Sequence, residues 1–400
     1  MLTRSSIRDE YGILLFFFYG IIFLPGALIS LFPSIQTNFF GVLIVCSLTA
    51  IYYLLSYRGT PPINLGFLTC SLVLSAAILL HLTTTQLIFG DLEISGGWKS
   101  IFSVISLLLI AVTCGFVADS ISRLSEECLL NLISGIFYWL VLLGFTVSIS
   151  IALKLQDSKS MLFFTEPSHY ALVASLFFCC KGLANRRSAL WFIPLIVIGI
   201  FIENITLIAG ILFALILIFA DRRSIVLLPL IFALAASALF LTSAEKSYYF
   251  ISRLNISPES DNTSVLTLLS GYEQAIIALR ETWGLGYGFQ RMGYINPRGE
   301  IVDVIASYRL GDASSNLHDG GTFLAKLVVE FGGFGILFFL LTIVAFFFFL
   351  RTKDLKHIFY CSICYVSILY FLLRGSGYFT SYPVLLLIAL ASLKPSSIKN

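Results

Sequence analysis

The chain has 400 residues, of which 58% are hydrophobic and only 12% are charged, and its mean hydropathy is +0.95. A soluble domain carries about 25% charged residues, so this composition excludes a water-soluble globular protein. The wealth of apolar side chains equally excludes an intrinsically disordered chain. The formal net charge of +3 is too small to indicate nucleic acid as a partner.

Apolar runs along the chain predict about twelve membrane-spanning helices, each needing roughly 20 residues. The first run, 11–31, is long enough to span and lacks a small-residue cleavage site, so we expect a retained helix rather than a signal peptide. The runs are 11–31, 39–57, 63–81, 101–118, 129–152, 168–181, 189–202, 205–220, 224–242, 322–350, 356–373 and 378–393.

The stretch 189–220 admits two interpretations, because Glu203 and Asn204 interrupt it. It is either one long helix with a buried acid or a hairpin of two short helices. Lys and Arg concentrate on the cytoplasmic side of membrane proteins, and only the hairpin puts the Arg186–Arg187 and Arg222–Arg223 pairs on the same side. The hairpin is therefore favoured, and it places both termini in the cytoplasm. The predicted organisation is an N-terminal membrane region (1–242), one large outer loop (243–321) and a C-terminal membrane region (322–400).

The large loop is too long to be a simple connection, and part of it has helical periodicity. Apolar side chains recur at helical spacing, which predicts an amphipathic helix resting on the membrane surface. A run of glycines then ends the helix. The apolar positions are Leu268, Tyr272, Ile276, Leu279 and Trp283, and the glycines are 284, 286 and 288.

The loop holds more acids than cations, and its cations other than Lys246 are arginines. Arginine makes planar bidentate contacts with phosphate, so Arg280, Arg291 and Arg309 are candidates for binding an anionic substrate. The alternative for each is an ion pair with a loop acid that only holds the loop fold.

The segment Ser315–Gly321 precedes the helix predicted to begin at 322. His318 in it is suited to accept a proton near neutral pH, and Gly320 would let a substrate approach the backbone closely. Asn316 and Asp319 flank the histidine, although neighbours in sequence often point apart. The alternative is an ordinary histidine in a helix-entry turn.

Two further places carry polar groups near predicted helix ends. Glu166, before Pro167, would lie at the positive end of a helix dipole and stay ionised; it is either a cap or a carboxylate facing a sugar hydroxyl or a catalytic cation. His169, one turn inside, could simply be a buried, hydrogen-bonded histidine. Arg374 lies in a short outer loop, where a cation opposes the usual charge bias.

No residue pattern predicts a metal ion or a cofactor. Cys361 and Cys364 lie within an apolar run, so we interpret them as helix-packing residues. The pair Asp91 and Glu93 is interpreted as a solvated turn rather than a metal site. The spacing Gly284-x-Gly286-x-Gly288 lacks the strand that a nucleotide-binding turn requires.

Taken together, these features resemble the superfamily of bacterial O-antigen polymerases (Wzy) and O-antigen ligases. The resemblance rests on the layout of about a dozen helices around one long loop and on short motifs. The motifs are Phe164–Ser168, Trp283–Gly288 with Gly286 and Tyr287, Asn316–Gly320 with Asp319 in place of the usual Asn, Glu330–Gly335, and the Arg309-x10-Gly320 spacing.

The resemblance implies an all-α polytopic membrane fold of GT-C-like glycosyltransferase architecture in the bacterial inner membrane. It implies metal-independent, inverting transfer from an undecaprenyl-diphosphate-linked oligosaccharide on the periplasmic face, with no cofactor. His318 would be the catalytic base, and Glu166 would orient the acceptor or a catalytic group. Arg280 and Arg309, with Arg291 or Arg374 as further candidates, would bind the diphosphate. Membrane lipid, a chain-length regulator and a flippase are the other implied partners.

Three functions therefore remain open at this point. The first is a polymerase that joins lipid-linked repeat units, which the Glu166-Pro167-Ser168 run and the modest loop favour. The second is a ligase that transfers finished polysaccharide to lipid A–core. The third is a transporter such as the lipid-linked oligosaccharide flippase, which predicts charges within the helices and repeated halves.

Overall fold

The computed structural model describes residues 4–32, 34–35, 37–56, 65–89, 95–157, 161–220, 244–294, 299–308, 318–375 and 377–393. Over these ranges the chain is helical, and its one extended pairing is an isolated bridge between Met161 and Phe164. Seven of the described helices contain a segment long and apolar enough to cross a membrane. The expectation of an all-α polytopic membrane protein is thereby confirmed, whereas twelve spans and a GT-C-like architecture remain predictions.

The described helices follow the apolar runs closely. The seven long ones are α1 (Arg4–Leu31), α2 (Phe39–Ser56), α3 (Leu65–Phe89), α4 (Ser95–Arg123), α5 (Glu126–Ala152), α14 (Gly333–Leu350) and α15 (Leu355–Leu372). The other described helices are α6 (Pro167–Ala184), the 3-10 helix η1 (Arg186–Trp191), α7 (Phe192–Phe201), α8 (Ile205–Ile218), α10 (Ala244–Leu254), α11 (Thr263–Glu281), α12 (Glu300–Tyr308), α13 (Phe323–Phe331) and α16 (Ser381–Ala391). The predicted run 224–242 lies outside the described residues.

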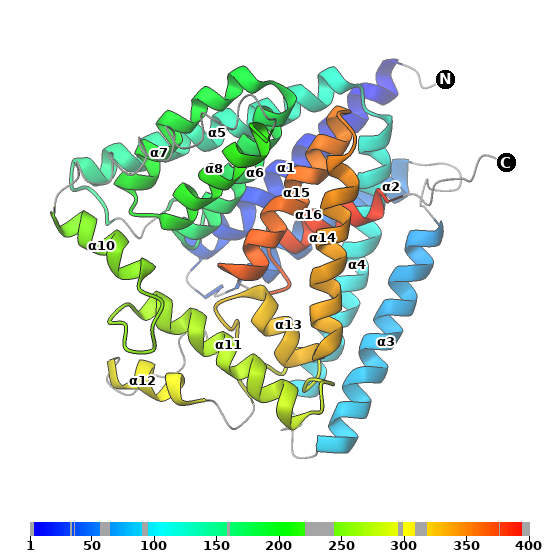
Figure 1. Ribbon diagram of the computed structural model, residues 1–400. Helices are drawn as coiled ribbons and strands as arrows, with labels where there is room; N and C mark the ends of the chain where they lie inside the picture. Colours follow the sequence, from blue (N-terminus) through cyan, green and yellow to red (C-terminus); the bar gives the residue numbers. More distant parts are fainter. Residues whose placement is uncertain are drawn as a thin grey trace.

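Helix α6 lies at the centre of the bundle, packed between α5, α8 and α15 (Figure 1). Nearly all of its residues are buried. Small residues allow this close packing, as they do in membrane helices generally. A side chain on Gly210 of α8 would collide with Ser175 of α6, and one on Gly144 of α5 would collide with Tyr170. By contrast, α3 packs against α4 and leaves most of its surface exposed.

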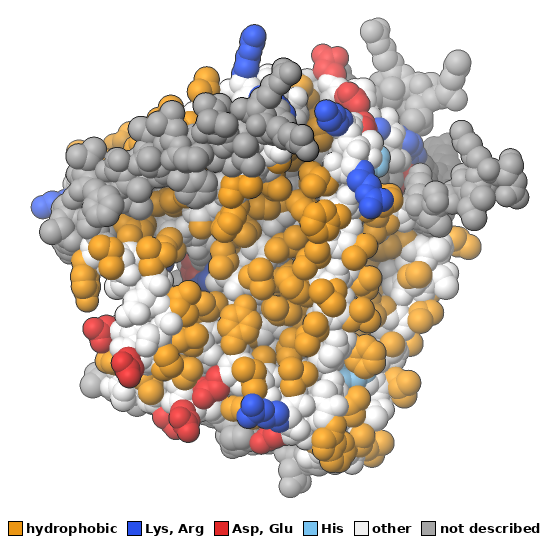
Figure 2. Space-filling view, in the orientation of Figure 1, with side chains coloured by type: hydrophobic (Ala, Val, Ile, Leu, Met, Phe, Trp, Pro, Cys, Tyr) orange, Lys and Arg blue, Asp and Glu red, His pale blue; other side chains and the backbone are white. Residues whose placement is uncertain are grey.

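Charge and apolar surface are separated along the bundle. Figure 2 shows an apolar belt across the helices, with charged side chains gathered above and below it. At the end where the chain begins, Arg123 of α4 pairs with Glu10 of α1. At the opposite end lie α11, α12 and α13 (Figure 1), and we refer to it as the α11–α13 end. An apolar belt of this kind is what a lipid-embedded protein requires.

The stretch 189–220 forms the predicted hairpin. Helices α7 and α8 pack side by side, and the turn between them contains Glu203 with a φ of +51°. The side chain of Asn204 caps α8 by accepting a hydrogen bond of 3.0 Å from the backbone N–H of Leu207. The interruption in the apolar run therefore marks a turn, because Asn is a preferred helix N-cap.

The prediction of one continuous helix over 322–350 is wrong. The chain breaks at Gly332, which has a φ of +57° and separates α13 from α14. Only glycine adopts such a backbone readily. Hydropathy alone does not reveal the break, because apolar residues continue on both sides of it. The break orients α13 separately from α14 and so places the buried pair Lys326 and Glu330 near the α11–α13 end.

The amphipathic helix of the large loop is present as α11. The face that it buries against the protein is not purely apolar. The face packed against the protein combines the polar Thr267, Ser270 and Gln274 with apolar residues such as Leu266 and Ala278. The predicted apolar side includes Ile276, which is 51% exposed, and Trp283, which lies beyond the helix end and is 82% exposed. Tyr272 and Leu279, which were predicted for the same apolar side, instead pack against buried residues of the protein. The expected lipid-facing side is therefore exposed only in part.

Candidate active site

Glu166 and Arg374, more than two hundred residues apart, meet at the ends of two helices. Glu166 is the N-cap residue of α6, yet its side chain makes no capping hydrogen bond. Its carboxylate instead forms an ion pair with Arg374, which follows α15 and donates from Nη2 and, at 3.1 Å, from Nε. Ser168 Oγ donates to the same carboxylate oxygen at 3.0 Å. Capping therefore does not account for Glu166, and its partner is a cation.

The Glu166 carboxyl is held in its ionised form. Burial by itself raises its pKa, but the charge of Arg374 and the hydrogen bonds from Arg374 and Ser168 outweigh this effect, so the net pKa lies below the ordinary value of 4.5. The prediction that Glu166 stays ionised is consistent with these contacts. Its side chain remains 39% exposed, so an oxygen of the carboxylate is accessible to a substrate hydroxyl.

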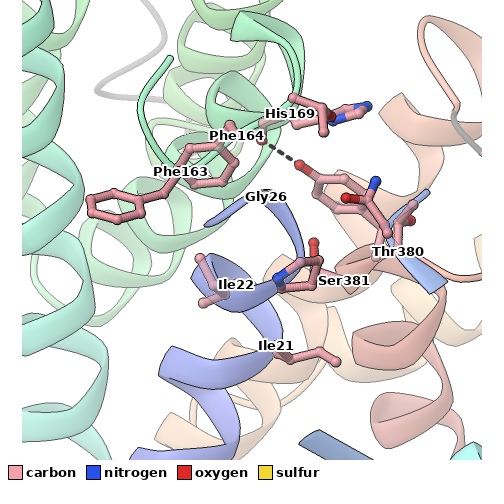
Figure 3. A pocket seen from close by; sticks show the side chains of 12 residues that line it. Ile21, Ile22, Gly26, Phe163, Phe164, His169, Thr380 and Ser381 are labelled. Carbon is pink, nitrogen blue, oxygen red and sulfur yellow. Dashed lines mark hydrogen bonds between the residues drawn. The ribbon is translucent and has the colours of Figure 1, made fainter. Parts of the chain in front are cut away.

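His169 is buried one turn inside α6. Its Nδ1 lies 2.7 Å from Thr165 Oγ1, and its Nε2 has no hydrogen-bond partner among the described residues. The hydroxyl of Tyr382, at the start of α16, donates to the backbone carbonyl of His169 (dashed line, Figure 3). The interpretation of His169 as a buried, hydrogen-bonded histidine is therefore confirmed for Nδ1.

A small pocket opens beside this segment, between the end of α1 and the starts of α6 and α16 (Figure 3). Uncharged polar groups and apolar side chains share its wall. Gly26 allows the walls to approach, because a Cβ there would lie 2.0 Å from the carbonyl oxygen of Phe163. The lining residues are Ile21, Ile22, Pro25, Gly26, Asn38, Phe163, Phe164, Thr165, His169, Thr380, Ser381 and Tyr382.

The glycine-rich segment after α11 docks against the break between α13 and α14. The backbone N–H of Gly333 donates to the carbonyl of Gly284 at 2.8 Å, and that of Gly288 donates to the carbonyl of Glu330 at 2.8 Å. Side chains are excluded here, since a Cβ on Gly286 would lie 2.5 Å from the N atom of Gly332. We call this docking of residues 284–288 on residues 330–333 the glycine contact. It brings together two motifs that are separate in sequence.

Tyr287 belongs to the glycine contact rather than to an open site. It is 8% exposed, and its hydroxyl donates to Glu281 at 2.6 Å. Burial and this hydrogen bond to the carboxylate raise the pKa of its phenol. Its backbone N–H bonds the carbonyl of Val329 at 2.9 Å. The contacts of Tyr287 therefore position the segment, as do those of Gly286.

Glu330 is a fully buried carboxylate beneath the segment that carries Arg291. Its Oε1 pairs with Lys326 at 2.9 Å and accepts the backbone N–H of Met292 at 3.3 Å. Its Oε2 accepts the backbone N–H of Gln290 at 2.9 Å and the hydroxyl of Tyr378 at 2.6 Å. A buried charge needs such partners, and here they come from three parts of the chain.

Arg291 is 1% exposed and lies between the two residues that Glu330 holds. Its Nε and Nη2 have no hydrogen-bond partner among the described residues. Burial lowers the pKa of this guanidinium, but arginine remains protonated in proteins. A buried cation with unused N–H groups is costly, and an anionic ligand would supply what these groups lack.

His318 lies against the residues that follow Arg291. Its Nδ1 is 3.1 Å from the carbonyl oxygen of Met292, and its ring packs at a tilt of 39° against that of Tyr294, with the centroids 4.7 Å apart. A carbonyl only accepts hydrogen bonds, so Nδ1 carries the proton when the ring is neutral and Nε2 keeps its lone pair. Gly293 makes this approach possible, because a Cβ there would lie 2.4 Å from Nδ1.

Residues 318–321 link the ion pair of Glu166 and Arg374 to the group formed by Glu330, Arg291 and His318. Asp319 Oδ1 would lie 3.1 Å from a Cβ on Gly377, in the loop after α15. The backbone N–H of Gly375 donates to the carbonyl of Gly321 at 3.1 Å. The segment that carries His318 is therefore adjacent to the loop that carries Arg374. Gly320 packs tightly as well, since a Cβ on Gly271 of α11 would lie 1.9 Å from its carbonyl oxygen.

The remaining predicted site residues are not placed in these clusters. Arg280 is exposed near the end of α11, and no described contact joins it to Arg291, His318 or Arg374. Its assignment to a substrate therefore stays a prediction. Arg309 and Asn316 lie outside the described residues, as do Asp91 and Glu93. Among the described residues, no group of three His, Cys, Asp or Glu side chains could hold a metal ion.

Several polar residues of this region were not singled out from the sequence. Lys326 and Glu330 had a detectable signal, because charged residues four apart inside an apolar run are unusual. The sequence carried no such signal for Lys99, whose Nζ lies 3.2 Å from the hydroxyl of Tyr294. Arg253 of α10 stacks on Tyr249 at 4.3 Å and is half-buried.

In comparisons with known proteins, the chain matches no family model, no curated protein and no solved structure.

Proposed function

We propose that the protein is an O-antigen polymerase. It would join undecaprenyl-diphosphate-linked oligosaccharide repeat units by inverting glycosyl transfer at the periplasmic face of the bacterial inner membrane. In this assignment the α11–α13 end faces the periplasm and both termini face the cytoplasm. The proposal rests on the family resemblance of the motifs and on one structural observation. The guanidinium of Arg291 is buried and its Nε and Nη2 have no hydrogen-bond partner among the described residues, and His318 Nδ1 bonds the backbone carbonyl of the next residue, Met292.

The proposed reaction uses this pair directly. The hydroxyl oxygen of the acceptor sugar attacks the anomeric carbon of the donor from the face opposite the diphosphate, and His318 Nε2 accepts the hydroxyl proton. The bond between the anomeric carbon and the diphosphate oxygen breaks, and the leaving group takes the bonding electrons. Arg291 binds that developing negative charge through Nε and Nη2. Arginine, rather than a metal ion, stabilises the leaving group in this mechanism.

Glu166 has a different role in the proposal. Its carboxylate is oriented by Arg374 and remains partly accessible, so it accepts a hydrogen bond from a hydroxyl of the acceptor sugar. Because residues 318–321 adjoin the loop of Arg374, a sugar that contacts Glu166 would extend toward His318. Arg374 is thus assigned to orienting Glu166 rather than to the diphosphate.

A deletion strain tests the proposal against its closest rival. Loss of a polymerase leaves single repeat units attached to lipid A–core, whereas loss of a ligase leaves long chains that are not attached. We expect single capped units, and complementation with His318→Ala should not restore long chains. His357→Ala is the matched control, because His357 pairs with Asp354 at 2.8 Å at the opposite end of the bundle. Unattached long chains in the deletion strain would contradict the proposal and favour the ligase.

A further inference from the structure

We propose that Glu330 is a positioning residue that fixes Arg291 and His318 relative to each other. The inference rests on the proposed function, in which these two side chains act on the diphosphate and on the acceptor proton. Glu330 itself is 0% exposed and touches neither ligand. Its carboxylate accepts the backbone N–H groups on both sides of Arg291, from Gln290 at 2.9 Å and from Met292 at 3.3 Å.

Two separate paths run from the same carboxylate to His318. In the first, Glu330 binds the N–H of Met292, and the carbonyl of Met292 accepts from His318 Nδ1 at 3.1 Å. In the second, Lys326 Nζ bridges Glu330 Oε1 at 2.9 Å and the backbone carbonyl of His318 at 2.5 Å. One path sets the tautomer of the imidazole, and the other sets the position of its backbone.

The geometry requires a carboxylate at this position. Four donors converge on its two oxygens, from Lys326, Tyr378 and the backbone of Gln290 and Met292. An ionised carboxyl offers acceptors only, whereas an amide replaces one oxygen by an NH2 group that would face donors. Glu330→Gln therefore leaves buried donors unpaired at one oxygen position, and the segment 290–292 must shift to relieve them.

Binding of farnesyl diphosphate to the purified full chain in lipid nanodiscs tests this role. Removing the partners that orient metal-ligating side chains costs about 10–100-fold in affinity or activity, and we take the lower end of that scale for a partner that orients Arg291. We expect Glu330→Gln to weaken binding by about 10-fold and Arg291→Ala to weaken it at least as much. Glu10→Gln is the matched control: Glu10 is also buried and paired with a cation, Arg123, at 3.4 Å, but at the opposite end of the bundle.

A double variant separates positioning from support of the fold. In Lys326→Met/Glu330→Leu both charges of the buried ion pair are removed, but the N–H groups of Gln290 and Met292 and the hydroxyl of Tyr378 lose their acceptor. We expect a chain that remains folded with a melting temperature below that of the wild type, together with the weakened binding of Glu330→Gln. Wild-type affinity in a double variant that remains folded would overturn the inference.

The tautomer of His318 supplies a readout that does not depend on the proposed function. The chain has only four histidines, so 15N-labelled histidine signals can be assigned by comparison with His318→Ala. We expect His318 to be protonated on Nδ1 in the wild type and to become a mixture of tautomers in Glu330→Gln. If the wild type binds no farnesyl diphosphate, the proposed function fails. An unchanged Nδ1–H signal in Glu330→Gln overturns the positioning role itself.

Discussion

Replacing Gly286 by alanine perturbs the glycine contact at its closest point. Gly286 has a φ of +79°, and a Cβ there would lie 2.5 Å from Gly332 N and 2.7 Å from the carbonyl of Glu330. All of these neighbours are backbone atoms, which cannot rotate away as a side chain could. Gly284 provides the matched control, because its φ is +82° and nothing lies within 4 Å of its Cβ position.

Both substitutions place a side chain on a left-handed backbone, but only Gly286→Ala also forces that side chain against neighbouring atoms. A left-handed backbone costs a non-glycine residue about 1–2 kcal/mol, and both variants bear it. Overpacking adds about 1–3 kcal/mol, and only Gly286→Ala bears that. We therefore expect about 1–2 kcal/mol of destabilisation for Gly284→Ala and about 2–5 kcal/mol for Gly286→Ala. A total stability of about 5–15 kcal/mol makes the larger loss severe.

Thermal unfolding of the two purified variants in the same detergent measures this difference. We expect the melting temperature of Gly286→Ala to fall clearly below that of Gly284→Ala. Chains made in cells that express Gly286→Ala should also shorten or disappear, because the displaced segment carries Arg291. Equal melting temperatures for the two variants would refute the reasoning, since they would mean that the close approach at Gly332 contributes nothing.

Three further predictions concern the ion pair, the buried arginine and a helix cap. The pKa of Glu166 is lowered on folding, so its stabilisation is present above pH 4.5 and is lost as the pH falls through the folded value. The melting temperature of Glu166→Gln should accordingly trail the wild type near neutral pH and approach it in acid; a constant gap would contradict the ion pair. Arg291→Lys removes the planar fork, and we expect roughly 100-fold slower chain formation in a gel assay of the polysaccharide; wild-type rates would remove Arg291 from the mechanism. Ser125→Ala removes the cap of α5, where Ser125 accepts from Cys128 N at 3.3 Å, and should cost about 1 kcal/mol without altering chain length.

Much of the fold follows from apolar run length, because lipid leaves the backbone few options besides a helix. The turn at Glu203–Asn204 could be derived as well, since a polar pair interrupts the run and the cation distribution favours a hairpin. The break at Gly332 could not, because the residues on both sides stay apolar and glycine is common in membrane helices. The break contacts the segment 284–288, which is distant in sequence, so local hydropathy carries no sign of it.

The candidate site was predictable in its residue types more than in its contacts. His318 was identified because an imidazole can accept a proton near neutral pH, and Glu166 because it precedes a helix that begins at Pro167; the family resemblance supplied their roles. Their partners were not, since the pairing of Glu166 with Arg374 and the approach of His318 to Met292 depend on how helices pack. Glu330 was recognised only as part of a motif, although a charge inside an apolar run is itself a functional signal.

The central claim is that this protein forms glycosidic bonds between lipid-linked repeat units. Incubation of the purified wild-type protein in nanodiscs with undecaprenyl-diphosphate-linked repeat units tests it most directly, with the products resolved by mass. We predict a ladder of products that differ by one repeat unit, together with released undecaprenyl diphosphate, and no ladder from His318→Ala. Substrate that remains monomeric with active wild-type protein, or a ladder that persists in His318→Ala, would contradict the account.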